Sequence, residues 1–389
     1  MSQLSTYAQL YLPVFQNYQS ELLARLETLV NIDSGTGQVE GVNRVMNYLQ
    51  QWFEELDFQV TLHPTDSFGP NLVARRRGRG ERRVLLVGHI DTVYTAGAVR
   101  AQPFAVEDGI ARGPGVIDMK SGVVMGLYAL RALSEAGFEH YGELVVLLNN
   151  DEEVGSPGSA ALLRDIARQV DVGLVLEPAG RPTVVTQARK GSDKYVLEVS
   201  GVPAHSGVEP YKGRSAVVEM AHKILAIQNL HALFPGVTFN ITRLSSSETL
   251  NIVPDRASCH VSVRAFNEAT LSAVADVLEQ LVASHSVPGT HTTLTRTLGR
   301  RPYEATPQVE RLVSLARAEG EALGLQLVAE PKGGVSDANN LMAAGLPTLD
   351  SLGPVGGGMH NLDVEYLRVA SIPLRGALLC GLIQRICLA

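Results

Sequence analysis

Short apolar strands alternate with amphipathic helices along this chain, and one compact block interrupts the alternation. Apolar residues from Val42 to Leu56 recur at steps of three and four, which predicts a helix. Further helices are expected at 121–137 and 159–168, and strands at 58–63, 71–75, 82–91, 143–150 and 172–177. Because strands that alternate with helices build a sheet covered on both faces, the sequence predicts an α/β domain with a mostly parallel sheet.

The pattern changes after about residue 186. A strand at 194–199 is followed by a helix at 214–231, strands at 237–245 and 257–266, a helix at 268–285 and a strand at 291–298. This order is βαββαβ, a ferredoxin-like unit that is complete in itself. A helix at 307–323, strands at 325–330 and 347–352, and a helix from about Val364 then resume the first pattern. We therefore expect one α/β domain built from residues 1–186 and 299–389, interrupted by an inserted α+β domain of residues 187–298.

Charge argues against a nucleic-acid partner. The chain has 389 residues, which is enough for two domains. It carries 33 Lys+Arg against 40 Asp+Glu, and this net charge of −7 is unfavourable for binding a phosphate backbone. Six arginines cluster between Arg75 and Arg83, but glycines interrupt them and no aromatic residues lie among them. We interpret this cluster as the solvated tip of a hairpin.

Neither a secretory signal nor a run of 18 apolar residues is found, so we expect a cytoplasmic protein without a membrane partner. The three cysteines, Cys259, Cys380 and Cys387, lie in apolar surroundings. This placement is typical of buried thiols in a reducing compartment rather than of disulfides or metal ligands.

Residues that could bind a metal follow the expected strands at their carboxyl ends. They are His89, Asp91, Asp118, Asp151, Glu152, Glu153 and Glu177, with His360 after a later strand. Each alone has an ordinary explanation as a turn or cap residue, but carboxylates that converge at one sheet edge need a cation or a partner. Nitrogen and oxygen ligands without thiolate suit Zn²⁺, and also Mn²⁺ or Co²⁺. Two histidines and three carboxylates at this edge would make five ligands. Five ligands are too many for one tetrahedral ion and fit two ions bridged by one carboxylate.

Eight segments resemble one known family. They are HIDTVY (89–94), GPGVIDMKSG (113–122), NNDEEVGSPGS (149–159), LEP (176–178), GVPAHSG (201–207), NIVPD (251–255), GGVSDA (333–338) and GMHNLDVEY (358–366). In this order they resemble the dinuclear-zinc peptidase family M20, and within it the bacterial glutamate carboxypeptidases of the carboxypeptidase G2 type. The resemblance implies that the larger domain is catalytic and that the inserted domain is a lid through which two subunits dimerise.

The resemblance also implies a ligand set for two Zn²⁺ per subunit. His89, Asp118 and Glu177 would bind one ion, and Asp118, Glu153 and His360 the other, so that Asp118 bridges them. Glu152 would be the general base, and Asp91 would orient the imidazole of His89. Family members have a cis peptide after the bridging aspartate, here Asp118–Met119.

The resemblance implies substrate contacts from three residues of the inserted domain and from two glycines of the larger domain. His205 would reach the active site of the partner subunit and donate a hydrogen bond to the oxyanion. Arg264 would bind the free α-carboxylate of the substrate, with Asn251 as a nearby polar contact. Gly333 and Gly334 would let backbone N–H groups approach the same carboxylate.

The implied function is a homodimeric metallohydrolase that cleaves a C-terminal peptide or N-acyl amide bond next to a free carboxylate. One alternative is an N-acyl-amino-acid deacylase of the acetylornithine deacetylase or aminoacylase type; another is a non-catalytic, dimeric carboxylate-binding protein. Loss of Glu152 or of a ligand would be expected in the latter, and neither is lost here. Glu177, in place of an aspartate, favours the carboxypeptidase and deacylase branch over the dipeptidases. Met359, where glutamate carboxypeptidases have tyrosine, leaves the side-chain preference open.

Overall fold

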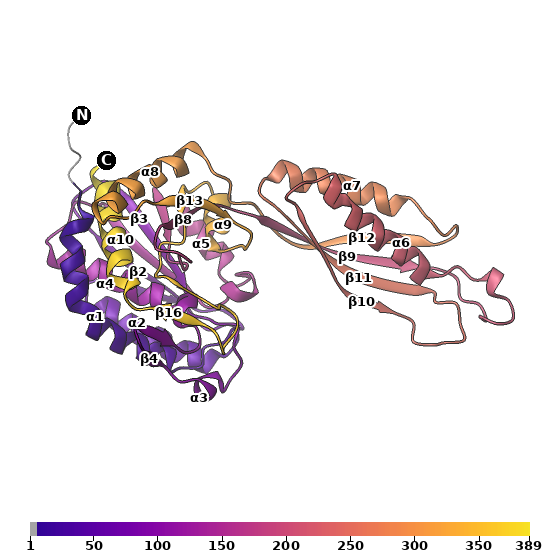
Figure 1. The fold of residues 1–389 in the computed structure, drawn as a ribbon, viewed down its shortest axis with the longest axis horizontal. Helices are drawn as coiled ribbons and strands as arrows, with labels where there is room; N and C mark the ends of the chain where they lie inside the picture. Colours follow the sequence, from indigo (N-terminus) through magenta and orange to yellow (C-terminus); the bar gives the residue numbers. More distant parts are fainter. Residues whose placement is uncertain (1–5) are drawn as a thin grey trace. The chain divides into compact units, whose positions relative to one another are not determined.

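Two compact units make up the computed structural model, which describes residues 6–389 (Figure 1). Residues 1–5, the first part of the predicted catalytic domain, lie outside the described residues. The larger unit contains the described residues up to Gln187, together with Ala305–Pro331 and Ser336–Ala389. The smaller unit contains Ala188–Glu304 and Lys332–Val335.

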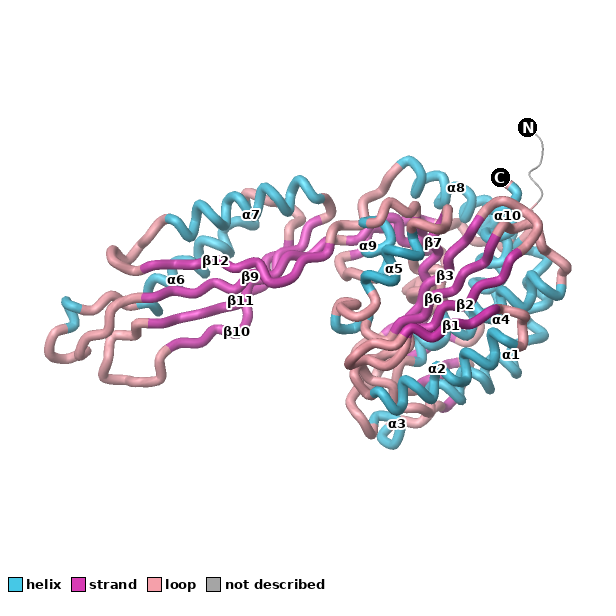
Figure 2. Tube along the Cα trace, turned by 180° about the vertical axis from the view of Figure 1, so that it is seen from behind, coloured by secondary structure: helices cyan, strands magenta, loops and turns pink. Residues whose placement is uncertain are grey.

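A six-stranded sheet forms the centre of the larger unit (Figure 2). Its strands are β1 (Gln59–His63), β2 (Asn71–Arg77), β3 (Arg83–His89), β6 (Glu143–Asn149), β7 (Val172–Val175) and β14 (Thr348–Leu349). Their order across the sheet is β1-β2-β6-β3-β7-β14. β3 and β6 are buried along almost their whole length, as expected for central strands with both faces covered.

The predicted α/β class is confirmed, with a sheet that is mixed. β6, β3, β7 and β14 are parallel, whereas β1, β2 and β6 pair in antiparallel fashion. Only the short turn at residues 78–82 joins β2 to β3, and a parallel arrangement would need a crossover connection of a dozen residues or more. Arg79 and Arg83 of the arginine cluster form ion pairs with Glu139 and Asp171 at this turn.

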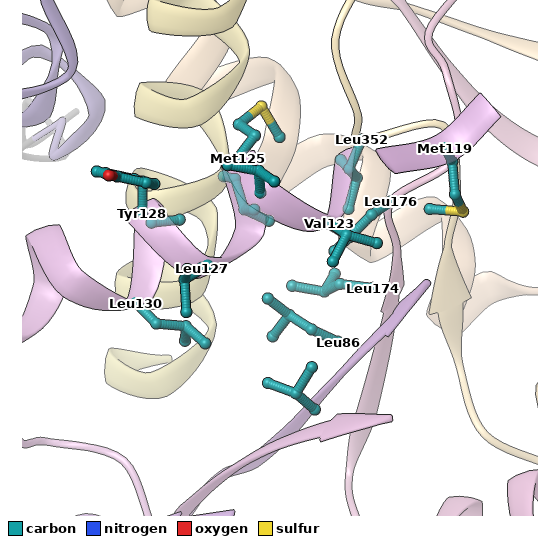
Figure 3. Close-up of a cluster of buried hydrophobic side chains, with 14 of the residues drawn as sticks. Leu86, Met119, Val123, Met125, Leu127, Tyr128, Leu130, Leu174, Leu176 and Leu352 are labelled. Carbon is teal, nitrogen blue, oxygen red and sulfur yellow. The ribbon is translucent and has the colours of Figure 1, made fainter. Parts of the chain in front are cut away.

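The larger unit also contains helices, several of which pack on this sheet. They are α1 (Ala8–Val30), α2 (Val39–Glu54), α3 (Ala98–Ala101), α4 (Ser121–Glu135), α5 (Ala160–Ala167), α8 (Pro307–Ala322), α9 (Asp337–Ala343) and α10 (Ser371–Leu388). Helices α1, α4 and α10 pack against one another, and α4 also contacts β3. Figure 3 shows Val123 of α4 beside Leu86 of β3 and Leu174 of β7 in the shared core.

α10 is the one helix in residues 6–389 that is long and apolar enough to cross a membrane by length and composition alone. Most of its residues are buried against α1, α4 and α8. Burial in a protein core therefore accounts for its apolar character.

Two elements at the chain ends differ from the prediction. No helix is predicted before Val42, yet α1 buries Tyr11, Phe15 and Leu22 on one face. The C-terminal helix begins at Ser371 and not at Val364. The preceding residues form the strand β16 (Tyr366–Arg368), which belongs to a small sheet with β4 (Ala105–Glu107), β5 (Ile110–Arg112) and β15 (Gly356–Gly357).

The smaller unit has the βαββαβ order. Its elements are β9 (Gly191–Ser200), α6 (Ala216–Asn229), β10 (Thr238–Ser246), β11 (Arg256–Ala265), α7 (Glu268–Ala283) and β12 (His291–Arg300). The strands form an antiparallel sheet in the order β10-β11-β9-β12 (Figure 2). Along β11, buried Cys259, Val261 and Val263 alternate with half-buried polar residues, so one face packs against α6 and α7.

The segment Lys332–Val335 belongs to the smaller unit, whereas the prediction placed it in the larger domain. Hydrogen bonds explain the assignment. The Lys332 carbonyl accepts the N–H of Lys190, the Gly333 carbonyl accepts from Arg264, and the Gly334 carbonyl accepts from Arg189. This segment begins at the last residue of the strand β13 (Val328–Lys332), which pairs with β8 (Val184–Arg189).

Candidate metal centre

The predicted ligands of the larger unit lie at the carboxyl edge of its parallel strands, where ligand sites form in α/β proteins. His89 ends β3, Glu153 lies in the short helix η2 (Glu152–Val154) after β6, and Glu177 follows β7. Asp118 lies in the turn η1 (Val116–Lys120), immediately before α4, and its peptide bond to Met119 is cis, as the resemblance implied. His360 lies in the loop before β16, with a left-handed φ of 65°.

Asp118 lies between the two histidines. Its Oδ1 is 3.3 Å from His89 Nε2, and its Oδ2 is 3.3 Å from His360 Nε2. Each histidine has a second carboxylate nearby, because Glu177 Oε1 is 3.8 Å from His89 Nε2 and Glu153 Oε2 is 3.2 Å from His360 Nε2. One carboxylate thus faces two groups of nitrogen and oxygen donors.

These separations fit ligands that share a metal ion. In a tetrahedral Zn²⁺ site with bonds of about 2.0–2.1 Å, neighbouring ligand atoms lie about 3.3–3.4 Å apart. The donor atoms of His89, Asp118 and Glu153 all lie within 4.8 Å of one another. In addition, the buried Oδ1 of Asp118 accepts no hydrogen bond within the described part of the chain, which leaves it able to bind a cation.

The tautomer of His89 also suits a ligand. Its Nδ1 lies 3.0 Å from the backbone oxygen of Asp91 and 3.3 Å from Asp91 Oδ1, and both of these atoms can only accept. The proton of the neutral imidazole therefore resides on Nδ1, and the lone pair of Nε2 faces Asp118.

Charge in the site favours a cation. Burial opposes protonation of His89, yet Asp118 and Asp91 raise its pKa well above the usual range. The neighbouring carboxylates of Asp118 and Glu153 raise the pKa of His360 to about 10. Burial would raise the pKa of Asp118, but the two histidines outweigh it and the pKa is lowered. The same negative field that holds protons on the imidazoles would attract a divalent cation.

Asp91 connects His89 to the acidic pair after β6. Its Oδ1 accepts the N–H of Glu152 and its Oδ2 accepts the N–H of Glu153, each at 3.2 Å. Thr36 donates to the same Oδ2 at 2.7 Å. Asp91 is fully buried, so these bonds fix the orientation of both glutamates.

Sequence reasoning assigned no role to two buried acids that hold these loops. Asp337 at the start of α9 accepts from Ser156 and Asn149, which flank Glu152 and Glu153. Glu365 accepts three backbone N–H groups from the turn that carries Asp118. Both lie inside segments that resemble the family, GGVSDA and GMHNLDVEY, and that position was the signal that the sequence offered.

In the smaller unit, His205 has the tautomer of a hydrogen-bond donor. Its Nδ1 accepts the N–H groups of Gly207 at 3.1 Å and Val208 at 3.2 Å. The proton of the neutral ring must then reside on Nε2. The side chain is exposed, and its loop is held by the bond from Ser206 N–H to the Asn251 carbonyl.

The remaining predicted substrate contacts also belong to the smaller unit. Arg264 Nη1 donates to the Gly333 carbonyl at 3.3 Å, and Arg189 Nη1 donates to the Gly334 carbonyl at 3.1 Å. The carbonyls of both glycines, rather than their N–H groups, therefore face the arginines. Neither glycine has a positive φ, and a Cβ at Gly333 would meet no atom within 4 Å. The side chain of Asn251 is exposed.

Comparison with known proteins identifies the family. The model for peptidase family M20/M25/M40 matches residues 85–385. The chain belongs to this family. It is 34% identical over 361 residues to carboxypeptidase G2 of Pseudomonas sp. (strain RS-16), which covers 92% of this chain and 87% of the relative. It is 26% identical over 328 residues to succinyl-diaminopimelate desuccinylase of Dechloromonas aromatica, covering 80% and 85% of the two chains.

Solved structures share the fold. Aminopeptidase PepT from Bacillus cereus aligns with a TM-score of 0.81 at 23% identity, over 95% of this chain and 98% of that chain. An M20 family metallo-carboxypeptidase from Sulfolobus solfataricus aligns with a TM-score of 0.73 at 16% identity, over 95% of this chain and all of that chain. The family predicted from the sequence is therefore confirmed, and the protein is a metal-dependent M20 hydrolase of peptide or amide bonds.

Proposed function

We propose that this enzyme cleaves a C-terminal peptide or N-acyl amide bond next to a free carboxylate, with two Zn²⁺ bound per subunit. The observation that carries the proposal is the position of Asp118, whose two oxygens each lie 3.3 Å from a different histidine. In this assignment His89, Asp118 and Glu177 hold one ion. Asp118, Glu153 and His360 hold the other.

Two side chains next to the ligands have separate roles in the reaction, Glu152 in proton transfer and Asp91 in orientation. Two zinc ions, when bound, polarise the amide carbonyl and lower the pKa of the attacking water toward about 7. Glu152 takes the proton from that water and later delivers it to the leaving amine. Asp91 holds the backbone of Glu152, so that the base keeps its orientation during both transfers.

Arg264 supplies the contact for the free carboxylate of the substrate. Its guanidinium is anchored at one end by the Gly333 carbonyl, and within the described residues 6–389 this is the one hydrogen bond that its five N–H donors make. A planar guanidinium binds a carboxylate through two parallel hydrogen bonds, which a neutral amide or ester terminus could not accept equally well.

His205 acts as the oxyanion donor of the partner subunit in a homodimer. Its Nδ1 is occupied by two backbone donors, so Nε2–H is the group that can donate. We expect His205→Ala to lower kcat by about 10²–10³. Mixing inactive His205→Ala and Glu152→Ala chains should restore partial activity, because one site of each heterodimer then has both groups. Absence of recovery would contradict donation across the interface.

Deacylation of an N-acyl amino acid is the second candidate. The similarity to succinyl-diaminopimelate desuccinylase favours it, because the name of that relative describes removal of an acyl group from an amine. Both candidates use the same bond type and the same base, and they differ in whether the acyl half of the substrate is an amino acid.

A substrate panel tests the proposal and separates the two candidates. Zinc-loaded enzyme is assayed with dipeptides and N-acyl amino acids, each with a free and an amidated C-terminus. We expect cleavage of the free acids only, and Arg264→Gln should raise KM for them with a smaller effect on kcat. Equal cleavage of the amidated compounds would refute recognition of a free carboxylate.

A further inference from the structure

The carboxylate of Glu365 is the point at which three ligand-bearing segments of the larger unit meet. Glu365 follows His360 by five residues and is 1% exposed. Its Oε1 accepts the N–H of Ile117 at 3.0 Å and that of Asp118 at 3.3 Å. Its Oε2 accepts the N–H of Gly115 at 3.3 Å and the hydroxyl of Tyr94.

The four partners of Glu365 come from two ligand-bearing segments, and Glu365 itself lies in a third, the segment of His360. Tyr94 follows His89 by five residues along the same loop, and Gly115 begins the turn that contains Asp118. One buried side chain thus ties the segments of His89, Asp118 and His360 together, and both of its oxygens are engaged by hydrogen-bond donors.

The direction of these bonds indicates a specific role. Three of the four partners are backbone N–H groups, which can only donate, so the glutamate accepts through both oxygens. Hydrogen bonds in a buried place of low dielectric are electrostatically stronger than the same bonds in water. They therefore fix the backbone of Asp118 at the point where its two oxygens must face two histidines.

We propose that Glu365 is a positioning residue that sets the spacing of the metal ligands by holding the Asp118 turn against the His89 and His360 loops. The inference rests on the ligand set proposed above. It goes beyond that set, because Glu365 acts on the ligands through backbone hydrogen bonds and not by binding the metal.

Glu319 offers a matched control within the same unit. It is fully buried and likewise accepts two backbone N–H groups, from Tyr7 at 2.9 Å and Ala8 at 2.7 Å, together with the side chain of Arg385. None of these partners belongs to a ligand-bearing segment. Glu319→Gln therefore reproduces the loss of a buried carboxylate without disturbing the proposed site.

The test measures metal binding itself. Purified metal-free wild-type, Glu365→Gln and Glu319→Gln proteins are titrated with Co²⁺ alone, and the visible absorption spectrum reports both affinity and ligand geometry. We expect Glu365→Gln to bind Co²⁺ about 10–100-fold more weakly and with an altered spectrum. Glu319→Gln should keep the wild-type affinity and spectrum while its Tm falls.

The outcomes separate this inference from the proposed function. If wild-type protein gives no Co²⁺ spectrum, the ligand set itself is wrong. If wild type binds and Glu365→Gln matches it, or if Glu319→Gln loses as much affinity as Glu365→Gln, the positioning role is refuted. Should Glu365→Gln fail to fold, Tyr94→Phe removes one of the four bonds and is expected to weaken Co²⁺ binding about threefold; unchanged affinity would then overturn the inference.

Discussion

Replacing Asp91 with asparagine tests how the site is held, because each oxygen of Asp91 has two partners. Oδ1 faces Glu152 N–H and His89 Nδ1, whereas Oδ2 faces Glu153 N–H and the hydroxyl of Thr36. An asparagine that keeps its oxygen at the Oδ1 position puts an NH₂ group at the position of Oδ2. The hydroxyl of Thr36 can turn to accept from this NH₂, but the backbone N–H of Glu153 cannot.

The expected magnitude follows from that one unpaired donor. A buried donor without a partner costs about 1–3 kcal/mol, which corresponds to roughly 5–150-fold in an equilibrium or rate constant. Because the strain falls on Glu153, a proposed ligand, we expect Asp91→Asn to weaken metal binding and lower kcat/KM by about 10–100-fold.

The assay combines Co²⁺ affinity with kcat/KM of the zinc-loaded enzyme, and Thr36→Val is the matched control. Thr36→Val removes one donor to Oδ2 and leaves the carboxylate in place, so its effect on both quantities should be small. Asp91→Asn values equal to those of wild type, or equal losses in the two variants, would refute the reasoning from unpaired N–H groups.

Three further predictions concern packing and buried thiols. Gly376→Ala should lower the free energy of unfolding by about 1–3 kcal/mol in urea titration, since a Cβ there would lie 2.2 Å from the Phe15 ring. Gly333→Ala should change the same free energy by less than about 0.5 kcal/mol, since its Cβ meets open space. Burial raises the pKa of Cys259 to about 11 and that of Cys387 to about 12, so neither should react with a thiol reagent at pH 8 in the native protein, and rapid labelling would contradict this. Because folding raises these values, the thiols stabilise the fold below their unfolded pKa of about 8.5, and Tm should fall as the pH rises from there toward 11.

The residues at the strand ends were predictable, because each strand and the residue that ends it can be recognised from a short stretch of sequence. His89, Glu153 and Glu177 each follow an apolar run, and the carboxyl ends of neighbouring parallel strands share one edge. The βαββαβ block was equally clear, since its strands and helices have different hydrophobic periods. α1 carries the same kind of signal, because its buried residues recur at steps of three and four: Tyr11, Phe15, Tyr18, Leu22 and Leu26.

Contacts between residues that lie far apart in the sequence could not be predicted from the sequence. Nothing in the sequence around Glu365 shows that Tyr94 and the Asp118 turn would meet it, because 247 or more residues separate the partners. The C-terminal helix begins later than predicted, because the residues before Ser371 form the loop of Glu365 and the strand β16. Similarly, only the fold shows that the carbonyls of Gly333 and Gly334 accept hydrogen bonds from two arginines.

The most direct test of the central claim is metal stoichiometry in the Glu152→Gln variant. Protein purified in zinc and freed of excess metal is analysed for zinc per chain, beside wild type, and both are assayed on the cleaved substrate. We expect two zinc ions per chain in both proteins and loss of turnover in Glu152→Gln alone, because Glu152 moves protons and holds no metal. A single ion per chain in wild type, or loss of an ion together with activity in Glu152→Gln, would contradict the bridged site and the assigned base.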